Sequence, residues 1–269
     1  MTNLQALILG FIQGVTEYIP VSSSSHLIFI PKLLGFTISA EVNFIATILL
    51  QLGTLVGIIA YFRRDLLAIT RDSFLALVKR DLFFSENSRV GYFLVVATIP
   101  AGIAGLFLQD TISYYFSVDY TFSFLLITAA LLAFGELIGK QRHDFISFRT
   151  ALLMGFFQIF ALLPGISRSG ATIAIAMVLG ATRVASVKFS FLMSIPIMLG
   201  ASFVALIKVI EDQALLSEIW LPLLLGFLAA AAVGYFVIGI MMNFIKKNSL
   251  LWFSLYCTVI GVLGITTSL

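Results

Sequence analysis

Two apolar segments of the chain carry the same polar interruption, and this repeat constrains the fold more than any other feature. Residues 10–13 read GFIQ, and 145 positions later residues 155–158 read GFFQ. A proline and a run of hydroxyl side chains follow each time, as PVSSSSH at 20–26 and PGISRSG at 164–170. Hydrocarbon tolerates such groups only where they have partners or a function. The two breaks are therefore the candidate active-site segments.

Composition places these segments in a lipid bilayer. Hydrophobic residues make up 60% of the 269 residues, charged residues make up 11%, and the mean hydropathy is +1.09. These values exclude an ordinary water-soluble domain. Apolar stretches near the roughly 20 residues that cross a bilayer predict six transmembrane helices, and no segment alternates as a strand would. The expected spans are 42–62, 90–109, 119–139, 188–208, 220–242 and 249–267.

The two broken segments are too short to cross the membrane twice. Pro20 separates 4–19 from 22–35, and Pro164 with Gly165 separates 149–163 from 167–180. A 14-residue helix rises about 21 Å, whereas the hydrocarbon core is about 30 Å thick. Each pair therefore predicts a re-entrant helical hairpin, over 4–35 and over 149–180. The alternative is one kinked span per pair.

The distribution of basic residues favours hairpins. With hairpins, 13 Lys and Arg lie on one side of the membrane and two on the other, whereas kinked spans divide them 10 to 5. Basic loops are usually cytoplasmic, so both termini and the opening of the site are expected to be extracytoplasmic. The 13 residues are Arg63, Arg64, Arg71, Lys79, Arg80, Arg89, Lys140, Arg142, Arg149, Arg183, Lys188, Lys246 and Lys247; the two are Lys32 and Lys208.

An odd number of crossings per half turns the second half upside down. The fold predicted for the single integral membrane domain, 1–269, is thus an all-α polytopic membrane protein with an inverted-topology repeat. Its halves are about 1–140 and about 148–269, each with one hairpin and three spans. The connection 63–89 alternates charged and apolar clusters and predicts an amphipathic helix on the cytoplasmic surface, with partner docking as the alternative.

The serines of both breaks lie where helix caps are expected. Ser22 to Ser25, and Ser167 with Ser169, each precede or open an apolar helical run. Two helix N-termini that converge in the membrane form an anion site, and Arg168 adds a charge and a planar fork suited to phosphate. The alternative is capping alone, which accounts for one serine per helix.

Two further ionisable residues lie beside the first break. His26 follows Ser23 by three positions, a spacing that brings a base and a nucleophile to one face of a helix. Glu17 follows Gln13 by four. A carboxylate at this depth requires a partner, a metal ion or a chemical role, so a salt bridge to Arg168 is one alternative. For His26 the alternative is a satisfied polar residue of the bundle.

These segments resemble the motifs of the bacterial undecaprenyl-diphosphatase family, also called the bacitracin-resistance phosphatases. Residues 13–17 (QGVTE) resemble its (Glu/Gln)-x-x-x-Glu motif, and 164–172 (PGISRSGAT) resemble its Pro-Gly-x-Ser-Arg-Ser-x-x-Thr motif. Residues 20–26 match its Pro-Val-Ser-Ser start and closing His. The resemblance runs the full length. The chain departs at Ser24-Ser25, where members often carry Thr-Gly, and at Gln13, where they often carry Glu, so Glu17 is the only carboxylate of its motif.

The resemblance implies hydrolysis of undecaprenyl diphosphate to undecaprenyl phosphate and inorganic phosphate, which recycles the lipid carrier of cell-wall synthesis. The implied place is the extracytoplasmic side of the bacterial plasma (inner) membrane. Implied partners are a polyprenyl diphosphate lipid and the membrane, with no nucleic acid, and a homo-oligomer stays open. The family uses a divalent cation, Mg²⁺ or Ca²⁺, that Glu17 is expected to help hold. The alternative is a transporter of polyprenyl phosphate, alone or in addition, because inverted repeats with broken helices are typical of transporters.

The expected catalytic residues are Glu17, Ser23, His26 and Arg168. Ser23 is the expected nucleophile, activated by His26 or Glu17, with activated water as the alternative. Arg168 is expected to hold the diphosphate and to stabilise the transferring phosphoryl group. The expected substrate-binding residues are Gln13, Ser22, Ser24, Ser25, Ser167, Ser169, Gly170 and Thr172.

Overall fold

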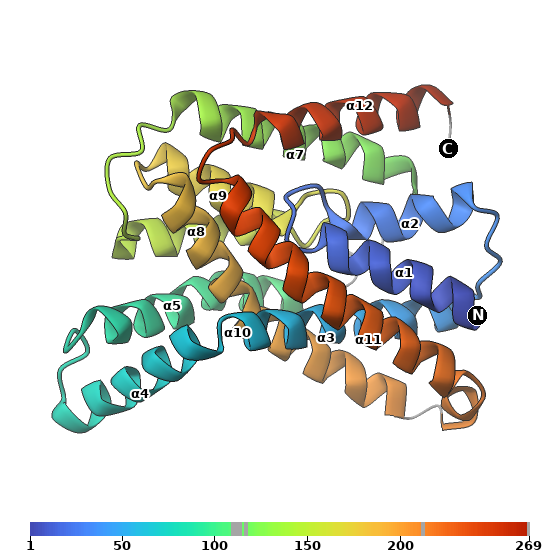
Figure 1. The fold of residues 1–269 in the computed structure, drawn as a ribbon, viewed down its shortest axis with the longest axis horizontal. Helices are drawn as coiled ribbons and strands as arrows, with labels where there is room; N and C mark the ends of the chain where they lie inside the picture. Colours follow the sequence, from blue (N-terminus) through green and yellow to red (C-terminus); the bar gives the residue numbers. More distant parts are fainter. Residues whose placement is uncertain (109–114, 116–117, 211–212, 268–269) are drawn as a thin grey trace.

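In the part of the chain that the computed structural model describes, the regular secondary structure is helical, apart from one isolated bridge between residues 143 and 181. It comprises residues 1–108, 115, 118–210 and 213–267. The helices (Figure 1) are α1 (Asn3–Thr16), α2 (Ser23–Leu33), α3 (Ala40–Tyr61), α4 (Arg63–Lys79), α5 (Glu86–Phe107), α7 (Val118–Ile138), α8 (Phe148–Phe160), α9 (Arg168–Val178), α10 (Arg183–Ile210), α11 (Gln213–Phe244) and α12 (Leu251–Thr267). This architecture confirms the all-α fold class.

Five helices are long and apolar enough to cross a membrane. These segments are Glu41–Tyr61, Glu86–Phe107, Tyr120–Ile138, Arg183–Phe203 and Ile219–Phe244, and they match the first five expected spans. The sixth expected span, 249–267, corresponds to α12, which has 17 residues and packs along α7 (Figure 1). At 1.5 Å per residue α12 rises about 25 Å, slightly less than a typical hydrocarbon core. The chain is thus a multi-pass membrane protein.

The four remaining apolar helices are short and pack in pairs. α1 and α2 have 14 and 11 residues, and α8 and α9 have 13 and 11. In Figure 1, α1 runs from the N-terminus into the middle of the molecule and α2 returns toward the same end. α8 and α9 likewise pack against each other. The tips of the two pairs meet, because the Gly165 N–H donates a hydrogen bond to Ser24 Oγ at 3.3 Å.

Glycines bring each hairpin close to a long helix of the other half of the chain. α1 packs on α11, and a Cβ at Gly10 would lie 2.3 Å from the carbonyl oxygen of Gly226. α8 packs on α5, and a Cβ at Gly155 would lie 2.4 Å from the carbonyl oxygen of Ala97. Small residues permit such close contacts between membrane helices, where packing rather than hydrophobicity drives association. The halves are therefore interlocked.

The two ends of the molecule differ in what they carry. The N-terminus and the end of α12 lie at one end, and α4 with the α7–α8 and α11–α12 connections lies at the other (Figure 1). The helix predicted within 63–89 is α4, and Leu67, Phe74 and Leu77 leave it an exposed apolar face. The Lys188 ammonium ties α10 to α4 through the Asp65 carboxylate at 2.5 Å. α4 and the α7–α8 and α11–α12 connections contain most of the 13 basic residues that the charge count places on one side of the membrane.

We predict that Gly155→Ala destabilises the protein and that Gly102→Ala does not. The added methyl group at 155 meets the α5 backbone, and overpacking of this kind costs about 1–3 kcal/mol. A Cβ at Gly102 meets nothing within 4 Å, and alanine is the better helix former. Thermal unfolding of both purified variants in detergent checks this. Equal unfolding temperatures for the two variants would show that the α5–α8 contact is not tight.

Candidate active site

The tip of the first hairpin is held in an uncommon backbone conformation by its own serines. Ser22 caps α2 with φ at 67°, in the left-handed region that residues other than glycine rarely adopt. Its Oγ accepts hydrogen bonds from the Ser25 N–H at 3.5 Å and the Ser25 hydroxyl at 3.0 Å, and lies 3.1 Å from Ser24 Oγ. These hydrogen bonds hold the turn in its strained conformation. Rare backbone conformations persist only where surrounding contacts fix them in this way.

The second tip repeats the same cap. Ser167 caps α9, and its Oγ accepts the Gly170 N–H at 3.1 Å and lies 3.1 Å from Ser169 Oγ. The two cap serines, Ser22 and Ser167, lie 145 positions apart, which is the spacing of the repeat. Ser23 and Arg168 are consequently equivalent first residues of α2 and α9. The predicted capping of both helices is confirmed.

A residue that sequence reasoning missed supports this second tip. Thr128 of α7 is fully buried and uses its hydroxyl twice: Oγ1 donates to the Gly165 carbonyl at 2.9 Å and accepts the Ser167 N–H at 2.8 Å. Both bonds join positions more than 35 residues apart. A single threonine in an apolar span gives no sequence signal for such a role.

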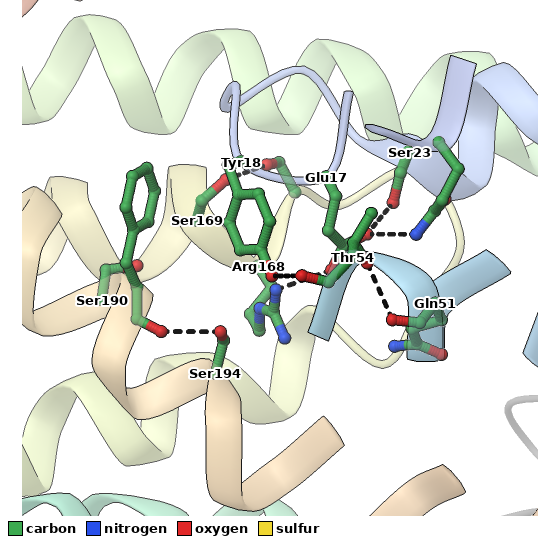
Figure 2. Close-up of polar contacts among 12 residues, drawn as sticks. Glu17, Tyr18, Ser23, Gln51, Thr54, Arg168, Ser169, Ser190 and Ser194 are labelled. Carbon is green, nitrogen blue, oxygen red and sulfur yellow. Dashed lines mark hydrogen bonds and ion pairs between the residues drawn. The ribbon is translucent and has the colours of Figure 1, made fainter. Parts of the chain in front are cut away.

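The Glu17 carboxylate is the centre of the polar contacts between the tips (Figure 2). Oε1 accepts a hydrogen bond from Arg168 Nη2 at 2.7 Å, and Oε2 accepts one from Ser23 Oγ at 2.6 Å and one from Gln13 Nε2 at 2.9 Å. The Glu17 and Arg168 side chains are 7% and 16% exposed. The salt bridge that the sequence left as an alternative is therefore formed. It also places a carboxylate directly on the predicted nucleophile.

A cavity of about 190 Å³ opens beside this cluster. Its polar lining residues are Glu17, Ser22, Ser23, Ser24, Gln51, Gln158, Ser167 and Arg168. The apolar lining comes from the second hairpin and from α10, as Ala161, Leu162, Ile166, Ile197, Met198 and Ala201. A cavity with one polar wall and one apolar wall suits a charged group attached to a hydrocarbon chain.

Five of the expected binding residues shape the tips and do not line this cavity. Gln13 binds Glu17, Ser25 binds Ser22, and Ser169 and Gly170 bind Ser167. Thr172 also lies away from the cavity. Its Oγ1 donates to the Arg168 carbonyl at 2.8 Å and lies 2.7 Å from Ser190 Oγ of α10. Thr172 thus links α9 to α10.

Of the two expected activators of Ser23, His26 and Glu17, the structure gives His26 other partners. Nδ1 lies 2.8 Å from the Ser22 carbonyl oxygen, and Nε2 lies 2.7 Å from the Tyr256 hydroxyl, on whose ring the imidazole stacks. Because a carbonyl only accepts, Nδ1 carries a proton, and in the neutral ring Nε2 accepts from Tyr256. Spacing along α2 places His26 near Ser23, but it cannot show that Glu17, which follows α1, binds the Ser23 hydroxyl.

Two polar groups at the cavity have no hydrogen-bond partner among the described residues. They are the Gln158 amide, through both Nε2 and Oε1, and Arg168 Nε. Sequence reasoning did not select Gln158 as a site residue. The repeat itself carried the signal, because Gln158 is the counterpart of Gln13.

The residues at the cavity fit a divalent cation only if the substrate supplies some of its ligands. Glu17 is the single carboxylate in its lining, and the described residues contain no cluster of three His, Cys, Asp or Glu that could hold a metal. Mg²⁺ is commonly held by one or two carboxylates together with substrate phosphates. Glu17 therefore fits a cation that a diphosphate shares, and not a cage made by the protein alone.

Comparison with known proteins gives one consistent family. The family model described as bacitracin resistance protein BacA matches residues 6–263. A protein of Methanosphaera stadtmanae named undecaprenyl-diphosphatase is 38% identical, with 98% of each chain covered. Undecaprenyl-diphosphatase 1 of Bacillus licheniformis is 37% identical with 96% of each covered, and the undecaprenyl-diphosphatase of Geobacter sulfurreducens is 37% identical with 97% of this chain and 96% of the relative covered.

Proposed function

Because the chain belongs to the bacitracin resistance protein BacA family, we propose that it hydrolyses undecaprenyl diphosphate to undecaprenyl phosphate and inorganic phosphate. The observation that carries this function is the Ser23 hydroxyl, whose Oγ donates to the buried Glu17 carboxylate at 2.6 Å beside Arg168. A nucleophile, a base and a phosphate-binding cation thus meet at one cavity. The product is the lipid carrier on which cell-wall polymers are assembled.

Arg168 and the N-termini of α2 and α9 bind the diphosphate. Among the described residues, the guanidinium is the only cationic side chain that lines the cavity. Both helices begin there, at Ser23 and Arg168, so their partial positive charges add to that of the guanidinium. The apolar wall formed by α10 residues such as Met198 receives the first part of the prenyl chain. Charge on the transferring phosphoryl group is stabilised by the same groups.

Ser23 attacks the terminal phosphorus of the diphosphate. As the Oγ–P bond forms, the hydroxyl proton passes to Glu17 Oε2. The bond from phosphorus to the bridging oxygen breaks, the bridging oxygen keeps the electron pair, and undecaprenyl phosphate leaves. Glu17 returns the proton to the leaving group. A water molecule then attacks the phosphoserine, gives its proton to Glu17, and Ser23 regains a proton from Glu17 as inorganic phosphate leaves.

The geometry favours Glu17 over His26 as the base. Both ring nitrogens of His26 have other partners, the Ser22 carbonyl and the Tyr256 hydroxyl. Glu17, in contrast, already accepts a hydrogen bond from the Ser23 hydroxyl. We assign His26 to positioning: its Nδ1–H holds the carbonyl of the residue with positive φ. The tip that presents Ser23 then keeps its shape.

We propose that Glu17, together with phosphoryl oxygens of the diphosphate, would hold a divalent cation, Mg²⁺ or Ca²⁺. When bound, such an ion would neutralise charge on the phosphoryl oxygens. The opening of the site and both termini are proposed to be extracytoplasmic in the bacterial plasma membrane, in accord with the basic connections at the opposite end of the molecule. Transport of the lipid is not favoured by any specific contact, whereas the Ser23–Glu17 contact is one that hydrolysis needs.

We predict that Ser23→Ala and Glu17→Gln each lower the rate of phosphate release about 10²–10⁴-fold, and that the double variant is no slower than either. The effects do not add because the serine and its base act as a unit. The measurement is phosphate release from a polyprenyl diphosphate in micelles by purified protein. Ser73→Ala, which changes a half-buried serine of α4 outside the cavity, is the control. Near-normal turnover by Ser23→Ala would rule out a phosphoserine intermediate and show that an activated water molecule attacks the phosphorus directly.

We predict that His26→Asn keeps turnover within about tenfold of the wild type and leaves the acid limb of the pH profile in place. Asn Nδ2 can donate to the Ser22 carbonyl as His Nδ1 does. His26→Leu removes this hydrogen bond and leaves the carbonyl only the backbone N–H of residue 26, at 3.4 Å, so we expect a net loss of about 0.5–1.5 kcal/mol. His26→Leu should therefore lose both activity and thermal stability. Disappearance of the acid limb in His26→Asn would identify the histidine as the base.

A further inference from the structure

Gln158 of α8 is a buried amide that nothing in the described part of the chain satisfies. The residue is 1% exposed, and neither Nε2 nor Oε1 has a hydrogen-bond partner. Buried polar side chains are bonded in the great majority of cases, so an exception of this kind requires a cause. Gln158 lines the cavity between the hairpin tips. The unsatisfied amide therefore belongs to a residue that borders the space a ligand would occupy.

The internal repeat explains why this amide is unpaired. The counterpart of Gln158 in the first hairpin is Gln13, whose Nε2 donates to Glu17 four residues further on. The residue four positions after Gln158 is Leu162, which also lines the cavity and whose side chain has no hydrogen-bond acceptor. The first amide is thus used to hold the carboxylate, and the second remains available.

The unpartnered atoms at this cavity are mainly donors. Gln158 Nε2 carries two N–H groups, and Arg168 Nε, which is also buried and unpartnered, carries one. A phosphoryl group offers several acceptor oxygens and satisfies such donors together. The apolar side chains of Leu162 and Ile166 lie in the same lining. They limit the water that competes for these groups.

We propose that Gln158 is a substrate-binding residue whose Nε2 donates to a phosphoryl oxygen of the diphosphate while Arg168 Nε donates to another. Its Oε1 accepts a hydrogen bond from a water molecule held beside the phosphoryl group. This inference rests on the proposed function and deepens it. Gln158 lies outside the three sequence motifs, at 13–17, 20–26 and 164–172, from which the site was expected.

The test compares Gln158→Met with the wild-type protein, using methylene diphosphonate as a probe that binds without turnover. Methionine has a similar length and no amide, so removing the unpaired buried polar group leaves the unfolding temperature of the ligand-free protein unchanged or higher. Binding of the diphosphonate, measured by the shift in unfolding temperature with its concentration, weakens about ten- to hundredfold. KM for a polyprenyl diphosphate rises in parallel.

Two further variants make the comparison specific. Gln158→Glu keeps the shape but faces the diphosphonate with a carboxylate, and we expect it to abolish binding at neutral pH. Ser202→Ala removes another buried hydroxyl that has no partner, on α10 but outside the cavity lining, and we expect unchanged binding.

Three outcomes would overturn the inference. They are wild-type affinity in Gln158→Met and Gln158→Glu, a lower ligand-free unfolding temperature in Gln158→Met with unchanged affinity, or no binding of the diphosphonate by the wild type. The proposed hydrolysis is decided separately. A wild type that binds the diphosphonate but releases no phosphate from a polyprenyl diphosphate refutes the activity, while the variants still decide the role of Gln158 in binding.

Discussion

The ion pair between Glu17 and Arg168 is the interaction on which the arrangement of the hairpins depends. The two charges come from different hairpins, 151 positions apart, and both are largely buried. Removing one partner of a buried pair typically costs about 3–5 kcal/mol, because the other charge is left uncompensated. The tips must therefore meet, and the close glycine contacts of α1 with α11 and of α8 with α5 allow them to do so.

The same pair sets the state of the site before the substrate arrives. Arg168 is neutralised by Glu17, and Glu17 also accepts the Ser23 hydroxyl and the Gln13 amide. In the proposed mechanism, a diphosphate competes with the Glu17 carboxylate for the Arg168 guanidinium. As Arg168 turns toward the phosphoryl oxygens, Glu17 loses its strongest donor and becomes a better acceptor for the Ser23 proton. In the proposed mechanism, binding of the substrate thus prepares the base.

Features encoded locally could be predicted from the sequence, whereas of the contacts between distant elements it offered only the Glu17–Arg168 pair, as one alternative. Proline and serine positions predicted the breaks and the caps Ser22 and Ser167. The partner of His26, by contrast, is Tyr256, 230 positions away, and Thr128 reaches the second tip from a third helix. Helical spacing identifies only those neighbours of a residue that lie on the same helix. It therefore could not decide between His26 and Glu17 as the activator of Ser23, and it is Glu17, at the end of α1, that binds the Ser23 hydroxyl.

The differences between the two copies follow from electrostatics. Both tips need the same serine cap, because each presents a helix N-terminus to the cavity. The charged positions cannot be the same. A glutamate at Leu162 would add a second carboxylate to the cavity that Glu17 lines, and an arginine at Ser23 would add a second cation beside Arg168 and remove the nucleophile. Like charges this close in hydrocarbon are unfavourable. A neutral site built from two copies must therefore be asymmetric, with the carboxylate in one copy and the guanidinium in the other.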